Sequence, residues 1–307
     1  MIQLKVTKVA TLPGHTGSVY TLLQDASSPD LFYSGSGDGM VIRWDLKDLR
    51  NGVVVSKVQA NIFSLQMHSE NNLLLIGQMQ GGIHVLDLKD KKEIRHLAFH
   101  QGGVYDIQID KEKKHILAAG GDGMLSVIDS ASLLLLKSIR VSQKNIRQLA
   151  FHPTKKLFAA GCSDNIAYIL DSEKFDTLYA LEQHGNSVFS VCFSPDGKRL
   201  LTGSRDAQLR VWDGEHEFQL LKTILAHLFT INCIVYSPDG KLFATAARDK
   251  SIKIWDAATF ELLKVIDKDK SDGHVNSVNK LLWTSHDNLL ISCSDDRSVM
   301  VWRIEAL

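Results

Sequence analysis

The chain has 307 residues, 44% hydrophobic and 23% charged, and is therefore long enough for one large domain or for two ordinary ones. Thirty-five basic residues balance 35 acidic ones, and a formal net charge of zero argues against binding to nucleic acid or membrane surfaces through overall charge. No run approaches the roughly 18 apolar residues of a membrane span, and the N-terminal segment lacks the apolar core of a signal peptide.

The four cysteines are too far apart to form Cys-x-x-Cys metal or redox pairs. They are Cys162, Cys192, Cys233 and Cys293. Each stands among apolar residues in a strand-like run, where a free thiol behaves as a small buried hydrophobic group. The sequence therefore predicts a cytoplasmic protein in a reducing compartment.

The first predicted strand is residues 4–12, LKVTKVATL, in which apolar and polar residues alternate. Beyond it, an apolar residue followed by Asp closes a strand pattern at regular intervals of 42, 42, 42, 42, 43 and 47 residues, with Arg replacing Asp in the last pair. The pairs are Trp44-Asp45, Leu86-Asp87, Ile128-Asp129, Leu170-Asp171, Trp212-Asp213, Trp255-Asp256 and Trp302-Arg303. This spacing predicts seven repeats, numbered one to seven below, that end near residues 45, 87, 129, 171, 213, 256 and 303.

Repeat five gives the clearest internal pattern, HGNSVFSVCFSPDGKRLLTGSRDAQLRVWD at residues 184–213. Ser-Pro-Asp-Gly at 194–197, which recurs at 237–240, predicts a turn because Pro fixes φ and Gly accepts a positive φ. The flanking VFSVCF and RLLTG are rich in residues that favour strands. No run has the length and spacing of an amphipathic helix, so the sequence predicts an all-β fold.

A period of about 42 residues, with Gly-His near its start and Trp-Asp at its end, resembles the WD-repeat (Trp-Asp repeat) β-propeller family. The resemblance covers essentially the whole chain and implies a single domain over residues 1–307, a seven-bladed β-propeller of four-stranded antiparallel blades. In this family the N-terminal strand completes the last blade. Residues 4–12 are therefore expected to close the ring, which removes exposed sheet edges.

The resemblance also implies a buried hydrogen-bond network of a turn His, a strand Ser or Thr, a turn Asp and the Trp. Four repeats carry complete sets: His15, Ser34, Asp38 and Trp44; His184, Thr202, Asp206 and Trp212; His227, Thr245, Asp249 and Trp255; and His274, Ser292, Asp296 and Trp302. Because buried polar groups need partners, Asp206→Ala is expected to cost about 1–3 kcal/mol of stability.

Repeats two to four depart from this pattern. Repeat three keeps His100 and Asp122 but has Ala118 and Ile128; repeat four keeps Asp164 but has Ser142, Ala160 and Leu170; repeat two has Val58, Ile76, Gln80 and Leu86. Replacing a whole polar set with apolar residues can be nearly neutral, whereas losing one partner leaves another unsatisfied. We expect apolar joints in these three repeats.

The resemblance places a partner-binding face at the mouth of the central channel. The residue that begins each innermost strand is expected to point toward the partner, and so is the residue seven positions before each Trp-equivalent. The first set is Tyr20, Phe63, Tyr105, Arg147, Phe189, Asn232 and Asn279, and the second includes Arg205 and Arg248. Aromatic residues and arginine dominate interface hot spots, and arginine suits carboxylates and phosphates.

We therefore predict a non-enzymatic scaffold that binds a peptide or loop of another protein, acidic or phosphorylated and with an apolar anchor. A monomeric propeller within a larger complex is expected. The alternative is that the aromatic residues only pack together and that each arginine pairs with a neighbouring Asp. The charged insertion KDKSD at 268–272 is expected to be a solvated loop, with contact to a partner as the alternative.

Three other functions fit the sequence less well. A Ser-His-Asp hydrolase is disfavoured because four copies of one triad make no catalytic sense and no Gly-x-Ser-x-Gly elbow is present. A hydrolase or lactonase with a channel metal is disfavoured, because this sequence has neither a cluster of carboxylates nor histidines with metal-ligand spacing. No catalytic residue, metal or cofactor is therefore predicted. A propeller that binds phosphoinositides or nucleic acid is disfavoured, because phosphoinositide-binding propellers carry a Phe-Arg-Arg-Gly motif that this sequence lacks, and the sequence has no basic tail.

Overall fold

The computed structural model describes residues 3–110, 112 and 114–306. These residues form seven four-stranded antiparallel sheets, with helix limited to one turn of α-helix and one 3-10 turn (Ser69–Asn71) in this part of the chain. The all-β prediction is confirmed. None of the described helical segments is long and apolar enough to cross a membrane.

The chain forms two compact units. Unit one holds residues up to 62 and from 227 onward, and unit two holds residues 63–226. The prediction of a single domain is not tested by this division and stays a prediction.

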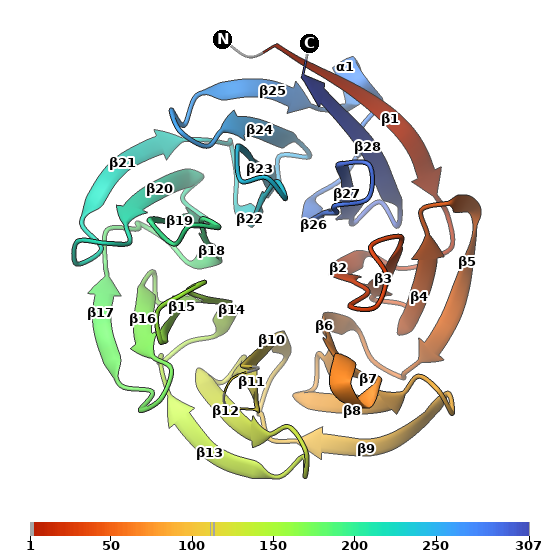
Figure 1. The fold of residues 1–307 in the computed structure, drawn as a ribbon, viewed down its shortest axis with the longest axis vertical. Helices are drawn as coiled ribbons and strands as arrows, with labels where there is room; N and C mark the ends of the chain where they lie inside the picture. Colours follow the sequence, from red (N-terminus) through yellow and green to blue (C-terminus); the bar gives the residue numbers. More distant parts are fainter. Residues whose placement is uncertain (1–2, 111, 113, 307) are drawn as a thin grey trace. The chain divides into compact units, whose positions relative to one another are not determined.

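Unit one contains three of the sheets (Figure 1). In pairing order, their strands are β2 (Val19–Gln24), β3 (Leu31–Ser36), β4 (Met40–Asp45) and β5 (Asp48–Lys57); β22 (Ile231–Tyr236), β23 (Leu242–Ala247), β24 (Ile252–Asp256) and β25 (Leu262–Ile266); and β26 (Val278–Trp283), β27 (Leu289–Ser294), β28 (Val299–Ala306) and β1 (Leu4–Leu12).

The N-terminal strand completes the sheet of the last repeat, as predicted. β1 pairs antiparallel with β28 from Leu4 opposite Ala306 to Leu12 opposite Val299, and Figure 1 shows the two strands side by side. The backbone edge of β28 is thereby paired along its length, which protects it from pairing with another chain.

Unit two contains the other four sheets. Their strands are β6 (Ile62–His68), β7 (Leu73–Gln78), β8 (Gly82–Asp87) and β9 (Lys92–Ala98); β10 (Val104–Asp110), β11 (His115–Gly120), β12 (Met124–Asp129) and β13 (Leu135–Arg140); β14 (Ile146–Phe151), β15 (Leu157–Cys162), β16 (Ala167–Asp171) and β17 (Thr177–Leu181); and β18 (Val188–Phe193), β19 (Arg199–Ser204), β20 (Gln208–Asp213) and β21 (Leu220–Leu225).

Burial follows the position of a strand within its sheet. Every residue of β27 is buried, because central strands pack against neighbouring sheets on both faces, whereas five of the six residues of the outer strand β21 are exposed. Within each unit the core consists of clusters between adjacent sheets. One such cluster in unit one joins Ile254, Leu290 and Trp302.

The predicted Ser-Pro-Asp-Gly turns form as the sequence indicates. The Gly197 N–H donates to the Ser194 carbonyl over 2.8 Å and the residue has a φ of +73°; Gly240 repeats both features, with 2.9 Å to Ser237 and a φ of +71°. A positive φ of this size favours glycine.

The 268–272 insertion begins with a helical turn, α1 (Lys268–Ser271), where a loop was expected. The Asp267 carboxylate caps this turn by accepting from the Lys270 N–H over 2.8 Å, and Asp272 forms ion pairs with Lys268 and with Lys8 of β1. Local capping and charge pairing thus order a segment that composition alone marks as solvated.

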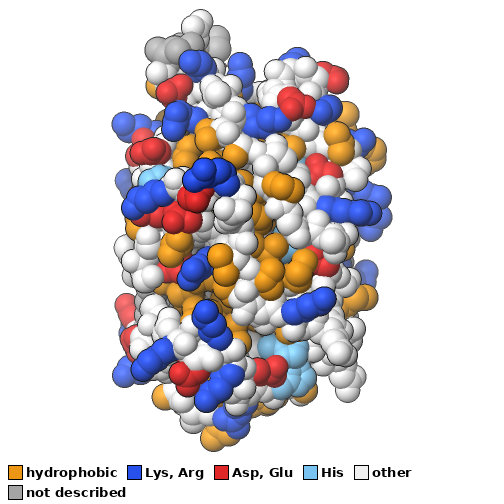
Figure 2. Space-filling view, turned by 90° about the vertical axis from the view of Figure 1, so that its right-hand side faces the viewer, with side chains coloured by type: hydrophobic (Ala, Val, Ile, Leu, Met, Phe, Trp, Pro, Cys, Tyr) orange, Lys and Arg blue, Asp and Glu red, His pale blue; other side chains and the backbone are white. Residues whose placement is uncertain are grey.

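Acidic and basic side chains are interspersed with hydrophobic ones on the face of the molecule in Figure 2. This mixture agrees with the formal net charge of zero.

Candidate functional site

Four repeats contain a buried chain of hydrogen bonds that links an indole, a hydroxyl, an imidazole and a carboxylate. In repeat seven, Trp302 Nε1 donates to Ser292 Oγ over 2.9 Å, and that oxygen lies 2.8 Å from His274 Nε2. His274 Nδ1 lies 2.8 Å from a carboxylate oxygen of Asp296. The same bonds join three more sets: His15, Ser34, Asp38 and Trp44; His184, Thr202, Asp206 and Trp212; His227, Thr245, Asp249 and Trp255.

Burial sets the charges in this network. It lowers the pKa of His15, His184 and His227 against the raising effect of the adjacent carboxylates, so these imidazoles are neutral at neutral pH. A neutral ring donates Nδ1–H to the carboxylate and accepts the hydroxyl proton at Nε2. Burial raises the pKa of Asp296, but hydrogen bonds and the charge interaction with His274 outweigh this effect and hold that pKa well below its ordinary range.

The hydroxyls of the four networks are not placed for nucleophilic catalysis. The four residues that carry these hydroxyls have no exposed surface: Ser34, Thr202, Thr245 and Ser292. A nucleophile must reach the substrate, so these Ser-His-Asp sets act inside the fold.

The hydrogen-bond network of repeat five includes a fifth residue, Arg210, which the sequence did not predict. Arg210 on β20 is 7% exposed, and its guanidinium donates to an Asp206 carboxylate oxygen over 3.1 Å and contacts His184 Nδ1. No motif marks the position, because it lies two residues before Trp212, where the other repeats have different side chains.

Repeats three and four keep fragments of the network. His100 Nδ1 lies 3.1 Å from Asp122, but Ala118 supplies no hydroxyl and His100 Nε2 has no hydrogen-bond partner among the described residues. In repeat four the Asp164 carboxylate instead accepts from Ser142 Oγ over 2.7 Å and from the Tyr168 hydroxyl over 2.9 Å.

Repeat two has an apolar interior. Val58, Ile76 and Leu86, which replace the signature residues, are all buried, while Gln80 is exposed. The expected apolar joint is therefore complete in this repeat and partial in repeats three and four.

One side chain from the first strand of each sheet in unit two joins a continuous stack. The rings of Phe63 (β6) and Tyr105 (β10) lie parallel within 12°, with centroids 5.3 Å apart. The Arg147 guanidinium (β14) lies over Tyr105 at 4.5 Å and over Phe189 (β18) at 4.7 Å. We call these residues the aromatic–arginine stack: Phe63, Tyr105, Arg147 and Phe189.

The two arginines of this face have different environments. Arg147 is half-buried and donates from Nε to Ser163 Oγ over 2.8 Å; burial lowers its pKa, and the nearby Arg205 guanidinium adds to that effect. Arg205 is exposed, and its side chain forms no ion pair with any described residue. Arg147 is thus held between aromatic rings, whereas Arg205 presents its charge to solvent.

In unit one, two positions equivalent to those of the aromatic–arginine stack hold asparagines, whose side-chain amides form hydrogen bonds between neighbouring sheets. Asn232 Nδ2 donates to the Val278 carbonyl over 2.8 Å and to Ser277 Oγ over 3.0 Å. Asn279 Nδ2 donates to the Val19 carbonyl over 2.9 Å and to Asp295 Oδ1 over 2.8 Å.

The two remaining residues of the predicted face in unit one are Tyr20 and Arg248. Tyr20 is half-buried with its ring beside Gly37, and Arg248 is exposed without an ion pair to a described residue.

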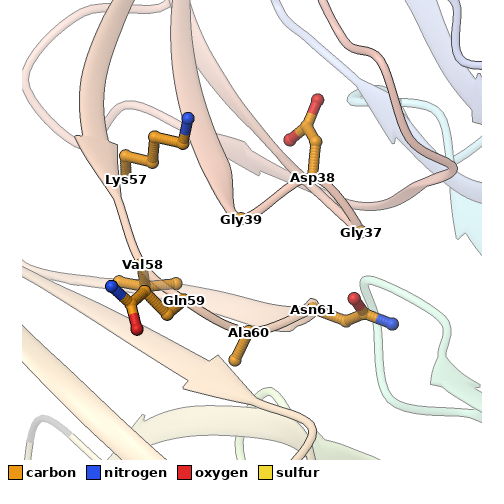
Figure 3. Close-up of a pocket in the computed structure, with 8 residues that line it drawn as sticks. All are labelled: Gly37, Asp38, Gly39, Lys57, Val58, Gln59, Ala60 and Asn61. Atoms are coloured by element: carbon orange, nitrogen blue, oxygen red, sulfur yellow. The ribbon is translucent and has the colours of Figure 1, made fainter.

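An open hollow of about 460 Å³ in unit one lies between the β3–β4 turn and the segment that leads into β6. Figure 3 shows the polar ends of Lys57, Gln59 and Asn61 pointing in different directions, not toward a common point. Small-molecule sites normally combine concavity with convergent polar groups, and this hollow lacks that convergence. Among the described residues, no group of three or more His, Cys, Asp or Glu is arranged to hold a metal ion.

The geometry defines a class of protein: an all-β repeat protein in which each period of about 42 residues supplies the outer strand of one four-stranded sheet and three strands of the next. The sequence model of the family "WD domain, G-beta repeat" (WD40) matches residues 6–45, 91–129, 134–171, 175–213, 218–256 and 264–303, more than half of the chain. The chain belongs to the WD40 family. The longest segment outside the matches, residues 46–90, contains repeat two, in which all four signature positions have changed.

The chain is similar to a solved structure described as the WD40 beta propeller domain of Doa1. The two are 21% identical over 97% of this chain and 96% of that chain, with a TM-score of 0.83. The likeness shows the fold: a β-propeller whose seven four-stranded antiparallel blades correspond to the seven sheets. A search of curated proteins gave no match. WD40 propellers are typically protein-interaction scaffolds and generally lack enzymatic activity.

Proposed function

We propose that this chain is a non-enzymatic scaffold that binds a peptide or loop of a partner protein on the face carrying the aromatic–arginine stack. The observation that carries the proposal is the stack itself. It places four half-buried, interlocked side chains of hot-spot types at the start of four successive first strands. Because the rings and the guanidinium are already ordered, little side-chain entropy is lost when a partner covers them.

Charge favours a partner segment with a carboxylate or phosphate beside an apolar residue. Arg205 is exposed, lies close enough to Arg147 to lower its pKa, and has no acidic partner among the described residues. Asp206, the next residue, is already occupied by His184 and Arg210. An arriving anion would therefore meet a cation that the fold leaves uncompensated, with an aromatic surface beside it.

The test is quantitative capture from native lysate by the wild-type chain and by the double variant Phe189→Ala/Arg205→Ala, with partners measured by mass spectrometry. We expect at least about 30-fold weaker capture by the variant, since two hot-spot residues are removed. The matched control is Arg95→Ala/Tyr179→Ala, which removes an arginine and an aromatic ring from the outer strands β9 and β17.

A binding assay on synthetic peptides separates the two parts of the proposal. Peptides with an aromatic residue beside Glu or phosphoserine are compared with Gln and Ser versions of the same sequence. The acidic peptides are expected to bind more tightly than the neutral ones, and their binding is expected to weaken as the salt concentration is raised.

In the lysate experiment, unchanged capture by Phe189→Ala/Arg205→Ala would show that the partner binds at another site. This conclusion requires that the double variant and its control melt at the wild-type temperature.

We further propose that the protein works in a reducing compartment. All four cysteines are in the thiol form and three of them are buried. Burial raises the pKa of the Cys162 thiol, which keeps it protonated and unreactive.

A further inference from the structure

Blade two, whose interior has lost the signature residues, carries a pair of histidines on its outer two strands. His84 on β8 and His96 on β9 are directly opposite each other in the antiparallel register, so their side chains project from the same face of the sheet. Their ring centroids are 4.6 Å apart and the rings are tilted by 38°. Neither ring takes part in the hydrogen-bond networks or in the aromatic–arginine stack.

This separation fits two ligands of one metal ion. With a metal–nitrogen bond of about 2.1 Å, two imidazole rings on adjacent coordination positions have centroids roughly 4.5–5.2 Å apart. The observed 4.6 Å lies within that interval. Neutral imidazole is the commonest protein ligand for divalent transition metals.

Each ring is oriented by a second polar side chain. His84 Nδ1 lies 3.1 Å from Glu93 Oε1, an arrangement in which Nδ1–H is donated to the carboxylate and the Nε2 lone pair remains available. His96 Nε2 lies 3.3 Å from Gln78 Nε2; rotation of that amide by about 180° lets its oxygen accept from Nε2–H and makes the Nδ1 lone pair available.

The backbone beneath the pair is adapted to His96. A Cβ on Gly82 would lie 2.2 Å from His96 Nε2 and 2.6 Å from Gln78 Nε2, so a larger residue there would displace both groups. The site is also open to solvent, because His96 is exposed and the side chains of His84 and Glu93 are 18% and 45% exposed.

We infer that His84 and His96 form a two-ligand binding site for a divalent transition metal ion such as Zn(II). Glu93 orients His84 without binding the ion. Two protein ligands leave the other coordination positions to water, in agreement with the finding that no group of three or more ligands occurs in the described part of the chain. Those positions are available to an imidazole or carboxylate from outside the chain.

Calorimetric titration of the untagged full-length chain with Zn(II) chloride in a non-chelating buffer tests this site. We expect one ion bound per chain with a dissociation constant in the micromolar range. His84→Ala and His96→Ala are each expected to weaken binding at least about 10-fold, and Glu93→Gln by a smaller factor. Both histidines lie on outer strands, and a thermal melt of each variant without metal verifies that it folds.

The matched control is His216→Ala. His216 also lies beside a carboxylate, with Nδ1 3.2 Å from Asp213, but its ring contacts no second histidine among the described residues. This variant is expected to bind Zn(II) like the wild type. The inference would be overturned if the wild type bound no measurable Zn(II), or if His84→Ala and His96→Ala bound Zn(II) as tightly as the wild type. The Phe189→Ala/Arg205→Ala variant is expected to keep the metal site, so this result is independent of the proposed scaffold function.

Discussion

Repeats two and seven build the same four-stranded sheet around different interiors. In repeat seven, Trp302, Ser292 and His274 form a hydrogen-bonded chain that ends at Asp296, whereas repeat two packs Ile76 and Leu86 in the corresponding places. Strand pairing and apolar burial are therefore enough to specify the blade. The polar network adds local stability, and its partial loss is less favourable than its complete loss, because a remaining member is left without a partner.

The largest effect is expected in repeat five, where the network also binds a buried arginine. Asp206→Ala is expected to cost about 3–5 kcal/mol of unfolding free energy, since it leaves Arg210 and His184 without their carboxylate. This value exceeds the about 1–3 kcal/mol expected from the signature residues alone. Denaturant unfolding measures it, with Asp296→Ala as the control that lacks an arginine partner and is expected to remain within about 1–3 kcal/mol. Equal losses in the two variants would contradict a special role for Arg210.

Repeat four tests whether a different residue has taken over part of the network. Tyr168→Phe is expected to cost about 1 kcal/mol, because it removes the hydroxyl that donates to Asp164 over 2.9 Å. Tyr179→Phe on the neighbouring strand β17 is the control, since that hydroxyl makes no hydrogen bond with a described residue. A Tyr168→Phe variant as stable as the wild type in denaturant unfolding would show that the hydrogen bond contributes nothing.

Repeat three offers the reverse experiment, restoration of a lost partner. Ala118→Ser is expected to raise the melting temperature, with a gain of about 0.5–1.5 kcal/mol, because the new hydroxyl can bond to His100 Nε2. Ala119→Ser places the same hydroxyl on the opposite face of β11, among apolar residues, and is expected to destabilise the protein. Destabilisation by both substitutions would mean that the site beside His100 lacks room for the oxygen.

The smallest expected effect near neutral pH is the change of unfolding free energy with pH. His15, His184 and His227 have folded-state pKa values below their ordinary value, so the unfolded chain binds more protons once the pH falls below about 6.5. The stabilisation that these neutral histidines provide is therefore complete above that pH and is lost as the pH falls below it. Carboxylates such as Asp249, whose pKa is also lowered in the fold, extend the loss below about pH 4. Denaturant unfolding at a series of pH values should show stability falling from about pH 6.5 downward; stability that rises on mild acidification would refute neutral buried imidazoles.

Much of the fold could be predicted because it is encoded locally. The spacing of the pairs that close the repeats predicts seven repeats, and the Ser-Pro-Asp-Gly turns lie where Pro and Gly place them. Alternation in residues 4–12 predicts a strand, and the resemblance to the WD-repeat family implied that this strand completes the last blade. The resemblance to the WD-repeat family implied the four complete networks, and their residues could be located because their spacing within one repeat is almost constant.

Contacts between strands and sheets that are distant in the sequence could be known only from the tertiary structure. Packing of neighbouring sheets placed Arg147 between two aromatic rings about one repeat away on either side, and used the Asn232 and Asn279 amides to bind the adjacent sheet. Strand register brought His84 opposite His96. A repeat pattern specifies where each side chain lies in its own blade; which side chain of the next blade it meets depends on packing, because those contacts join residues that no local pattern relates.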